Sequence, residues 1–526
     1  MSPGNFGRVV IVALLLPSLP GGADFAQEAP GEYDEFRIEV DSGTKPAQGE
    51  WKWKAAVRAC AKPEYIGKDD ETTPAVTKGD LDYLRDRLNL EPNLDRIRAI
   101  GDAVRATILG PKLEPMLASC FAEAQNNHGR GLRLVVVLKQ GVVPPDTVGP
   151  IEVPVEALRV LSIPNLEEFP ATDTRFLVVR SLDQQPVEPT PVKSPVRMLV
   201  IAASPTDQVG SASVKESIDA ICRALRGLAF DDQCQSLPSG PVKVTLCKGV
   251  TRRRFEDLMN REGPWDIVHF VGHGAFPSEG DEDPTPRAQL LFQREDGTSD
   301  RVGALEFATA LKIGHPRLVV LTACSSAAPR PAEGASLRSR ALANPFDGVA
   351  QHLLRTNVTS VVAMQFDFEV KAAELFSREF YDSLIRWQQN DDVAVARCRN
   401  ALAFDSDFGH GIWITPALYS RSRGGRIFQY LDHLELGGMV LDGTTLQPLP
   451  GVSLTVRGIL GADGRIPVAV TDAQGQFRFG DLQPSEARQV DLVAEKEGYQ
   501  LERSRPTLGN PMQYLKLRRI RPGGGP

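Results

Sequence analysis

Two strand-like segments in the middle of the chain each end in a side chain that can take part in covalent chemistry. His273 follows an apolar run and stands between Gly272 and Gly274, and Cys324 follows the apolar run 318–321. A thiol attacks as the thiolate, and a nearby imidazole can take its proton and later return it to a leaving amine. If the two strands are neighbours, this pair has the groups needed for nucleophilic attack on a carbonyl carbon.

The glycines beside the histidine predict how the oxyanion of such a reaction is stabilised. We expect the strand over 267–271 to break at Gly272 and Gly274, which would lift the imidazole off the carboxyl edge of a sheet. The backbone N–H groups of Gly274 and Cys324 are then candidate oxyanion donors, and losing one such donor typically costs about 3–4 kcal/mol in the barrier.

Each residue alone also has a structural interpretation. A lone cysteine at a strand end is usually a small buried hydrophobe, and a lone strand histidine is usually packed. His269, four residues before His273, is predicted to be such a packed histidine, with orientation of the base as the alternative. The combination favours chemistry, because two units of one domain end in complementary groups roughly fifty residues apart, the spacing of the caspase pair.

The elements around these residues alternate between strands and helices over 195–428. This order predicts an α/β fold, a mainly parallel sheet with helices on both faces, in which chemistry lies at the carboxyl ends of the strands. The predicted strands cover 196–204, 242–247, 266–274, 317–325 and 360–365, and the predicted helices cover 212–228, 251–261, 347–356 and 370–387.

The same region resembles a CHAT domain, a caspase-like domain often found in bacteria. The matching segments are HFVGHG, LVVLTAC, FDGVAQHLLRTNVTSVVAMQFDFEVKAAELFSREFYDSL and WITPALYSR, with IEVPVEALRV upstream. The resemblance implies a member of the clan of caspase, separase and gingipain cysteine peptidases, with His273 and Cys324 as its catalytic residues. The caspase signature Q-A-C-[RQG]-G agrees only at Ala323-Cys324, and the tetratricopeptide repeats of many relatives are not seen.

The flanking segments predict three further units. Residues 1–28 are a signal-like or disordered leader, residues 29–190 an N-terminal α/β domain, and residues 434–521 a small antiparallel β-sandwich, with a proline-rich linker between the N-terminal domain and 195–428. In the N-terminal domain we expect strands at 36–43, 51–59, 132–138 and 176–180, and helices at 80–90 and 93–109 that Asp80 and Asn93 cap.

The sandwich also carries a resemblance. It is similar to a carboxypeptidase regulatory-like module through GGMVLDGTTLQPLPGVSLTV, VTDAQGQFRF and VAEKEGY. Such modules usually mediate contacts rather than catalysis and are common outside the cytoplasm, so the resemblance favours export.

Composition bounds the partners and the compartment. The net charge of −7 and the lack of a basic stripe argue against nucleic acid, and no apolar run past the leader is long enough to span a membrane. The seven cysteines form no C-x-x-C pair, so we expect free thiols, no metal and no cofactor. A cytoplasmic location follows, with export as the alternative if the apolar run Val9–Leu16 is a signal.

Two functions remain open from the sequence. The first is a cysteine endopeptidase that cuts a specific protein partner, and the second is a non-catalytic scaffold with a degenerate caspase-like domain. The acidic segment 278–284 is predicted to be a solvated loop, with selection of basic substrates as the alternative, and Asp367 and Glu369 are candidates for a specificity pocket.

Overall fold

The computed structural model describes most of the chain outside the leader. The described residues are 33–42, 51–88, 92–128, 130–139, 148–182, 184–192, 194–207, 211–237, 240–275, 289–323, 345–356, 358–366, 368–408, 410–430, 434–445, 447–461, 465–482, 490–506 and 513–520.

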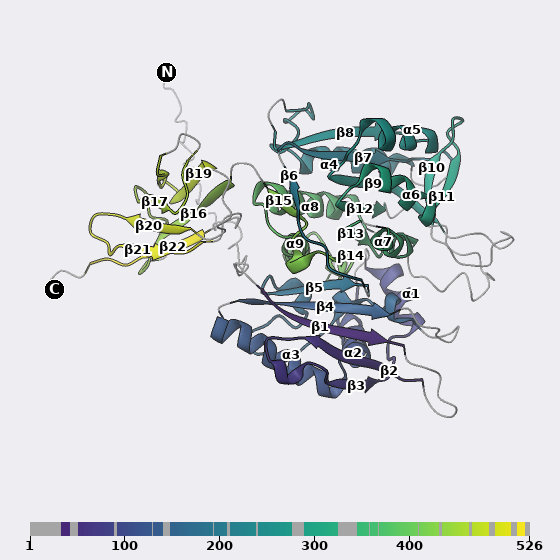
Figure 1. Cartoon of the computed structure of the whole chain (residues 1–526), viewed down its shortest axis with the longest axis horizontal. Coiled ribbons are helices and arrows are strands. Elements are labelled where there is room, and N and C mark those ends of the chain that lie inside the picture. Colours follow the sequence, from purple (N-terminus) through teal and green to yellow (C-terminus); the bar gives the residue numbers. More distant parts are fainter. Residues whose placement is uncertain are drawn as a thin grey trace, which may run out of the picture.

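One large sheet runs through the described part of the chain from residue 33 to residue 420 (Figure 1). It has thirteen strands, of which eleven follow the order β11-β10-β9-β12-β13-β14-β5-β4-β1-β2-β3, while β7 pairs with β9 and β8 pairs with β7. Most of its pairings are parallel, so the predicted α/β fold with a mainly parallel sheet is confirmed.

The central half of the sheet holds the two strands that precede the candidate residues. These are β9 (Ile267–Ala275) and β12 (Leu318–Ala323), which pair in parallel. The other strands of this half are β7 (Val196–Ala202), β8 (Val242–Lys248), β10 (Gln289–Gln293), β11 (Ser299–Gly303), β13 (Ser360–Met364) and β14 (Pro416–Ser420).

Helices cover both faces of this half, each over its own apolar cluster. On one face α4 (Ser211–Ala224), α8 (Val370–Tyr381) and α9 (Asp391–Phe404) pack on side chains such as Val271 and Val320. On the other face α5 (Arg252–Asp257), α6 (Ala304–Gly314) and α7 (Pro345–Arg355) pack on Phe270 and Leu321. Successive strand residues point to opposite faces, so β9 and β12 contribute to both clusters.

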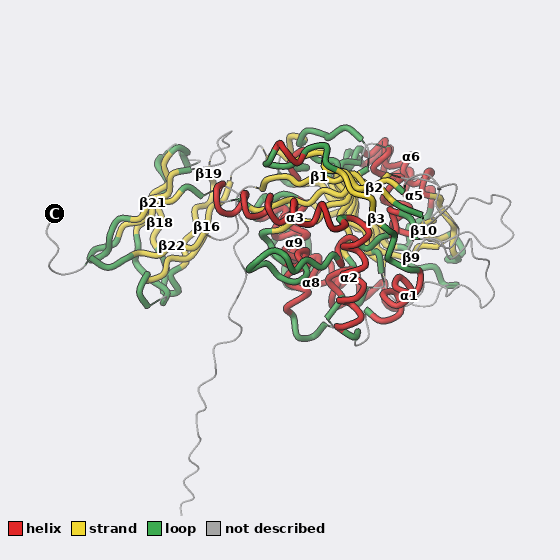
Figure 2. Tube along the Cα trace, turned by 90° about the horizontal axis from the view of Figure 1, so that it is seen from below, coloured by secondary structure: helices red, strands yellow, loops and turns green. Residues whose placement is uncertain are grey.

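The strands of the region that the sequence predicted to be a separate N-terminal domain form the other half of this sheet. Its apolar face is covered by α2 (Leu94–Ile108) and α3 (Gly110–Glu123), as Figure 2 shows from below. The strands are β1 (Tyr33–Asp41), β2 (Trp53–Ala59), β3 (Asp69–Thr72), β4 (Gly131–Lys139) and β5 (Phe176–Ser181), and α1 (Lys78–Arg87) precedes α2.

Two strand pairings join the halves. β14 pairs in parallel with β5 at Tyr419 and Arg180, and β6 (Thr190–Val192), within the proline-rich linker, pairs with β15 (Phe428–Tyr430). The sheet is therefore continuous across the domain boundary that the sequence predicted near residue 190.

The C-terminal segment folds as two small sheets around a common apolar core that includes Leu436, Leu454 and Leu517. One sheet has the order β19-β16-β22 and the other β18-β17-β20-β21. The strands are β16 (Leu434–Asp442), β17 (Ser453–Arg457), β18 (Val468–Val470), β19 (Gln476–Leu482), β20 (Asp491–Glu495), β21 (Glu502–Ser504) and β22 (Gln513–Leu517). The pairing of β16 with β22 is parallel, so the sandwich is mixed rather than purely antiparallel.

Of the two helix caps expected from the sequence, one is wrong and one is confirmed. Thr77, not Asp80, caps α1, and Asp80 lies at the third helical position, where it completes a capping box with Thr77. Asn93 caps α2 as expected, by accepting a hydrogen bond from the N–H of Arg96 at 3.1 Å.

The expectation of free thiols is also wrong for four of the seven cysteines. Cys60 is bonded to Cys120, and Cys222 is bonded to Cys234. The sequence could not reveal this, because each pair joins segments that only the fold brings together.

Candidate active site

Strand β9, which carries His273, is paired along its whole length. On one side it pairs with β12, and on the other side β7 pairs with its first half while β10 pairs with residues 273 to 275. The predicted break at the two glycines is therefore wrong, and β9 runs through both of them. The reason is β10, which extends the ladder beyond the point where β7 leaves it.

Gly272 has a packing role in place of the predicted break. A Cβ atom at this position would lie 2.8 Å from Cζ of Phe270 and 3.2 Å from the carbonyl oxygen of Ala203. Glycine lets these groups approach the strand closely, one residue before the imidazole.

In the register between β9 and β12, the residue before His273 pairs with the residue before Cys324. Ala323, the last residue of β12, pairs with Gly272. The next residue on β9 is His273, and the next residue in the sequence after Ala323 is Cys324, which lies outside the described residues. The condition set by the sequence, that the two strands be neighbours, is met.

His273 has a buried imidazole. The residue is 2% exposed, and its Nε2 atom has no hydrogen-bond partner among the described residues. Burial lowers the pKa of His273 below its usual value, because desolvation disfavours the imidazolium. The ring is therefore neutral at pH 7 and has a nitrogen available to accept a proton.

Gly274 lies inside the antiparallel ladder between β9 and β10, in register with Leu290. The sequence predicted a loop at this position, and that prediction is wrong because Gly274 is part of β9. Its assignment as an oxyanion donor, like that of Cys324, stays a prediction.

His269 is packed and fully hydrogen-bonded, as the structural interpretation expected. It is fully buried, its Nε2 lies 3.0 Å from Oγ1 of Thr322, and its Nδ1 lies 2.9 Å from the hydroxyl of Tyr381 on α8. Burial lowers the pKa of His269 to about 3, so this ring stays uncharged. Sequence reasoning missed Thr322 and Tyr381, which no motif distinguishes.

The other sequence candidates are only partly visible. The acidic segment 278–284 and Asp367 lie outside the described residues. Glu369 immediately precedes α8 as its N-cap residue, with no side-chain capping bond. Glu369, the one candidate of this group within the described residues, makes no hydrogen bond to Nε2 of His273.

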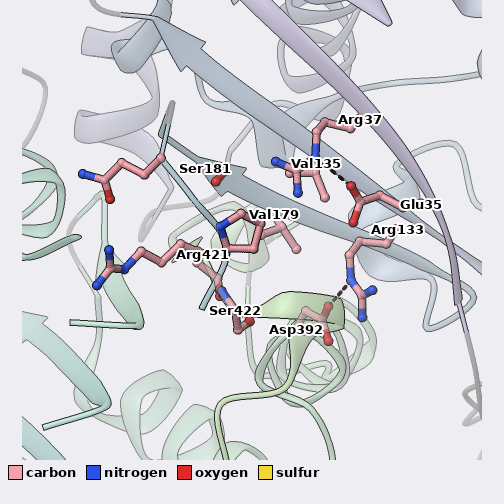
Figure 3. Close-up of a pocket in the computed structure, with 13 residues that line it drawn as sticks. Glu35, Arg37, Arg133, Val135, Val179, Ser181, Asp392, Arg421 and Ser422 are labelled. Atoms are coloured by element: carbon pink, nitrogen blue, oxygen red, sulfur yellow. Dashed lines mark hydrogen bonds and ion pairs between the residues drawn. The ribbon is translucent and has the colours of Figure 1, made fainter. Parts of the chain in front are cut away.

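A polar pocket lies elsewhere in the sheet, at the junction of its two halves (Figure 3). Its lining comes from β1, β4, β5 and the residues just after β5, from the start of α9, and from the end of β14 and the segment after it, and not from β9 or β12. Figure 3 shows Arg133 reaching Asp392 and Arg37 reaching Glu35, at 2.7 Å in the second pair. These charges are paired internally, so the pocket adds no group to the chemistry at His273.

Within the described ranges, no group of three or more His, Cys, Asp or Glu side chains is arranged to hold a metal ion. A search of the same residues finds no helix long and apolar enough to cross a membrane. Of the described cysteines, Cys247 and Cys398 carry free thiols, the first partly exposed and the second buried.

Comparison with known proteins identifies the family. The CHAT domain matches residues 113–413, more than half of the chain. The protein therefore belongs to the CHAT domain family, whose domains have a caspase-like fold. The match begins within α3, so it includes strands from both halves of the sheet.

Solved structures give distant similarities. The Arg-specific cysteine proteinase gingipain R (RgpB) is 12% identical with a TM-score of 0.33, over 83% of this chain and 94% of that chain. The complex of the Porphyromonas gingivalis RgpB pro- and mature domains is 11% identical with a TM-score of 0.32, over 83% and 96%. The shaft pilin SpaA from Lactobacillus rhamnosus GG is 12% identical with a TM-score of 0.16, over 21% and 60%. No curated protein matches the chain.

Proposed function

We propose that this CHAT domain protein is a cysteine endopeptidase that cleaves a specific protein partner with a His273–Cys324 dyad. One observation carries the proposal. Ala323, the last residue of β12, pairs with Gly272, so His273 is the next residue along β9 and Cys324 is the next residue in the sequence after β12, and His273 has a buried Nε2 with no partner among the described residues.

The proposed reaction has two stages. Nε2 of His273 takes the proton of the Cys324 thiol, and the sulfur attacks the carbonyl carbon of the scissile peptide bond to form a tetrahedral oxyanion. The intermediate collapses as the C–N bond breaks, and His273 returns its proton to the leaving amine. Water, deprotonated by His273, then hydrolyses the thioester and restores the thiol.

The state of His273 suits this role. A general base must be neutral before it acts, and the lowered pKa keeps His273 neutral at pH 7. An imidazole held in a paired strand loses little further freedom when it meets its partner. A scaffold would have no need of an unpartnered buried nitrogen, which costs free energy.

Alkylation with iodoacetamide, followed by mass spectrometry of each cysteine peptide, tests the dyad without a known substrate. At pH 7 we expect Cys324 to react about tenfold or more faster than Cys247, whose pKa is raised by burial. His273→Ala should remove that advantage. Equal rates for the two thiols, or a Cys324 rate independent of His273, would favour the scaffold.

Cleavage itself requires a second experiment. Proteome-wide comparison of new N-termini in cells with the wild-type chain and with Cys324→Ala should give a small set of sites that depend on the thiol. His273→Ala should lose the same sites. Cleavage that persists in both variants would assign it to another enzyme.

We also propose that the chain works in an oxidising compartment, and that its C-terminal sandwich is a carboxypeptidase regulatory-like module that contacts the partner. Two disulfides support this location, because disulfides persist in secreted and periplasmic proteins and are rare in the cytosol. Peptide mapping without reduction, on protein purified from its native host, should recover Cys60 joined to Cys120. Free thiols at both positions would instead indicate that the protein works in a reducing compartment.

A further inference from the structure

A chain of hydrogen bonds below the candidate site links both catalytic strands to helix α8. The Tyr381 hydroxyl lies 2.9 Å from Nδ1 of His269, and Nε2 of His269 lies 3.0 Å from Oγ1 of Thr322. The Thr322 hydroxyl in turn donates to the carbonyl oxygen of Phe270 at 3.2 Å. All three side chains are buried, with Thr322 the most exposed at 6%.

The direction of these bonds follows from proton accounting. Thr322 has one hydroxyl proton and gives it to Phe270, so its oxygen accepts from His269. His269 then carries its proton on Nε2, and Nδ1 accepts from the Tyr381 hydroxyl. Every donor and acceptor of the imidazole is thereby satisfied in one tautomer.

These hydrogen bonds lie on the same two strands as the residues of the proposed dyad or the positions just before them. His269 precedes His273 by four residues on β9, and Thr322 precedes Cys324 by two residues on β12. Side chains on a strand alternate between faces, so His269, His273 and Val271, the cross-strand partner of Thr322, point to the same face. Among the described residues, this series of hydrogen bonds therefore links β9 and β12 on the face of His273, near the ends of both strands.

We propose that His269 and Thr322 are positioning residues that hold the relative register of β9 and β12, and with it the approach of His273 to Cys324. The inference rests on the proposed function. Tyr381 completes the unit by fixing the imidazole from α8.

A purely structural role does not require this chemistry. Apolar side chains fill most core positions of both strands, and replacing all partners of a buried hydrogen bond together by apolar groups of the same shape can be nearly neutral or stabilising. A fully satisfied polar chain instead specifies one arrangement of the groups that it joins.

The experiment uses two substitutions of one residue in the full chain. Thr322→Val keeps the shape and loses the hydroxyl, whereas Thr322→Ser keeps the hydroxyl. The readout is the rate of Cys324 alkylation by iodoacetamide at pH 7, with Cys247 in the same molecule as the reference. We expect T322V to slow Cys324 by about tenfold and T322S to restore at least half of the wild-type rate.

A double-mutant cycle separates positioning from general destabilisation. In the His273→Ala background, T322V should have no further effect on Cys324, because the base that it positions is gone. If T322V slows Cys324 equally in both backgrounds, or leaves the wild-type rate unchanged, the positioning role is wrong. If His273→Ala itself leaves the rate of Cys324 unchanged, the proposed function is wrong as well.

A second variant covers the case in which T322V does not fold. Tyr381→Phe removes one hydroxyl from the far end of the chain and leaves both strands unaltered. We expect it to slow Cys324 by a smaller factor than T322V, about threefold, because His269 keeps its bond to Thr322. No change in the Cys324 rate in folded Y381F would contradict the inference.

Discussion

Two of the places where the sheet buries polar groups differ in what satisfies those groups. At the junction of β5 and β14, Glu156 is paired with Arg180 and lies 3.5 Å from Arg399, and Gln365 donates to it at 2.8 Å. At the end of β9, Nε2 of His273 has no partner among the described residues. The first arrangement joins two halves of the sheet, and the second leaves an imidazole nitrogen without a partner in the described part of the chain, as the proposed general base requires.

Removing the charge at the junction should have the largest effect on stability. Burial alone would raise the pKa of Glu156, but Arg180 and Arg399 outweigh it and hold the pKa below its usual range. Glu156→Gln leaves two buried guanidinium groups without their counter-charge, so we expect a loss of about 3–5 kcal/mol in the free energy of unfolding, measured by urea titration. Glu167→Gln, at an exposed position, is the control. Equal stability of both variants would mean that the pair is not what joins the halves.

Each half also carries one disulfide, which extends the comparison. Cys60 and Cys120 are 60 residues apart in the N-terminal half, and Cys222 and Cys234 are 12 residues apart in the central half. Closing the longer loop restricts the unfolded chain more, so replacing the first pair by alanine should cost about 4 kcal/mol and the second pair about 3 kcal/mol. Thermal unfolding of the two double variants measures the two losses of stability. A larger loss for the Cys222–Cys234 pair than for the Cys60–Cys120 pair would contradict this expectation.

Asp391, another buried carboxyl group near the junction, should make stability fall as the pH rises. Burial and then the charge of Asp392 raise the pKa of Asp391 to about 7, although the hydroxyls of Ser360 and Ser420 bond to it. The folded state then binds this proton more tightly than the unfolded state, so stability is lost as pH rises between about 4 and 7, by at most about 1.4 kcal/mol per pH unit. Asp391→Asn should remove that slope, and Asp407→Asn, on the surface, should keep it.

The smallest effect is expected at the strand end, with the opposite sign. His273→Leu removes an unpartnered buried nitrogen, so the free energy of unfolding should stay equal or rise by about 1 kcal/mol. His269→Leu removes a satisfied imidazole from the same strand and should lower it. Urea titration of both variants tests the contrast, and a large loss in H273L would show that His273 is held by interactions that stabilise the fold.

The sequence predicted most strands of the sheet, because apolar runs such as those of β4 and β12 mark buried strands whatever surrounds them. It missed α9, whose side chains are buried around most of its circumference, so no apolar stripe stands out. It also missed α3, which begins at Gly110-Pro111 and contains Pro115, residues that normally argue against a helix.

The candidate site was predicted in part for the same reason. His273 and Cys324 stand out in the sequence because each follows an apolar run, and the pairing of β9 with β12 meets the condition that the two strands be neighbours. The hairpin of β10 and β11 was not predicted, since its short strands pair with β9 only through the fold. That pairing is why the expected break at the glycines does not occur.

The continuous sheet has a consequence for handling the protein. A recognition site for a sequence-specific protease, inserted at the exposed Gln185 in the linker, would let the chain be cut between β5 and β6. Because β5 pairs with β14 and β6 pairs with β15, the two fragments should elute together from a size-exclusion column and part only in denaturant.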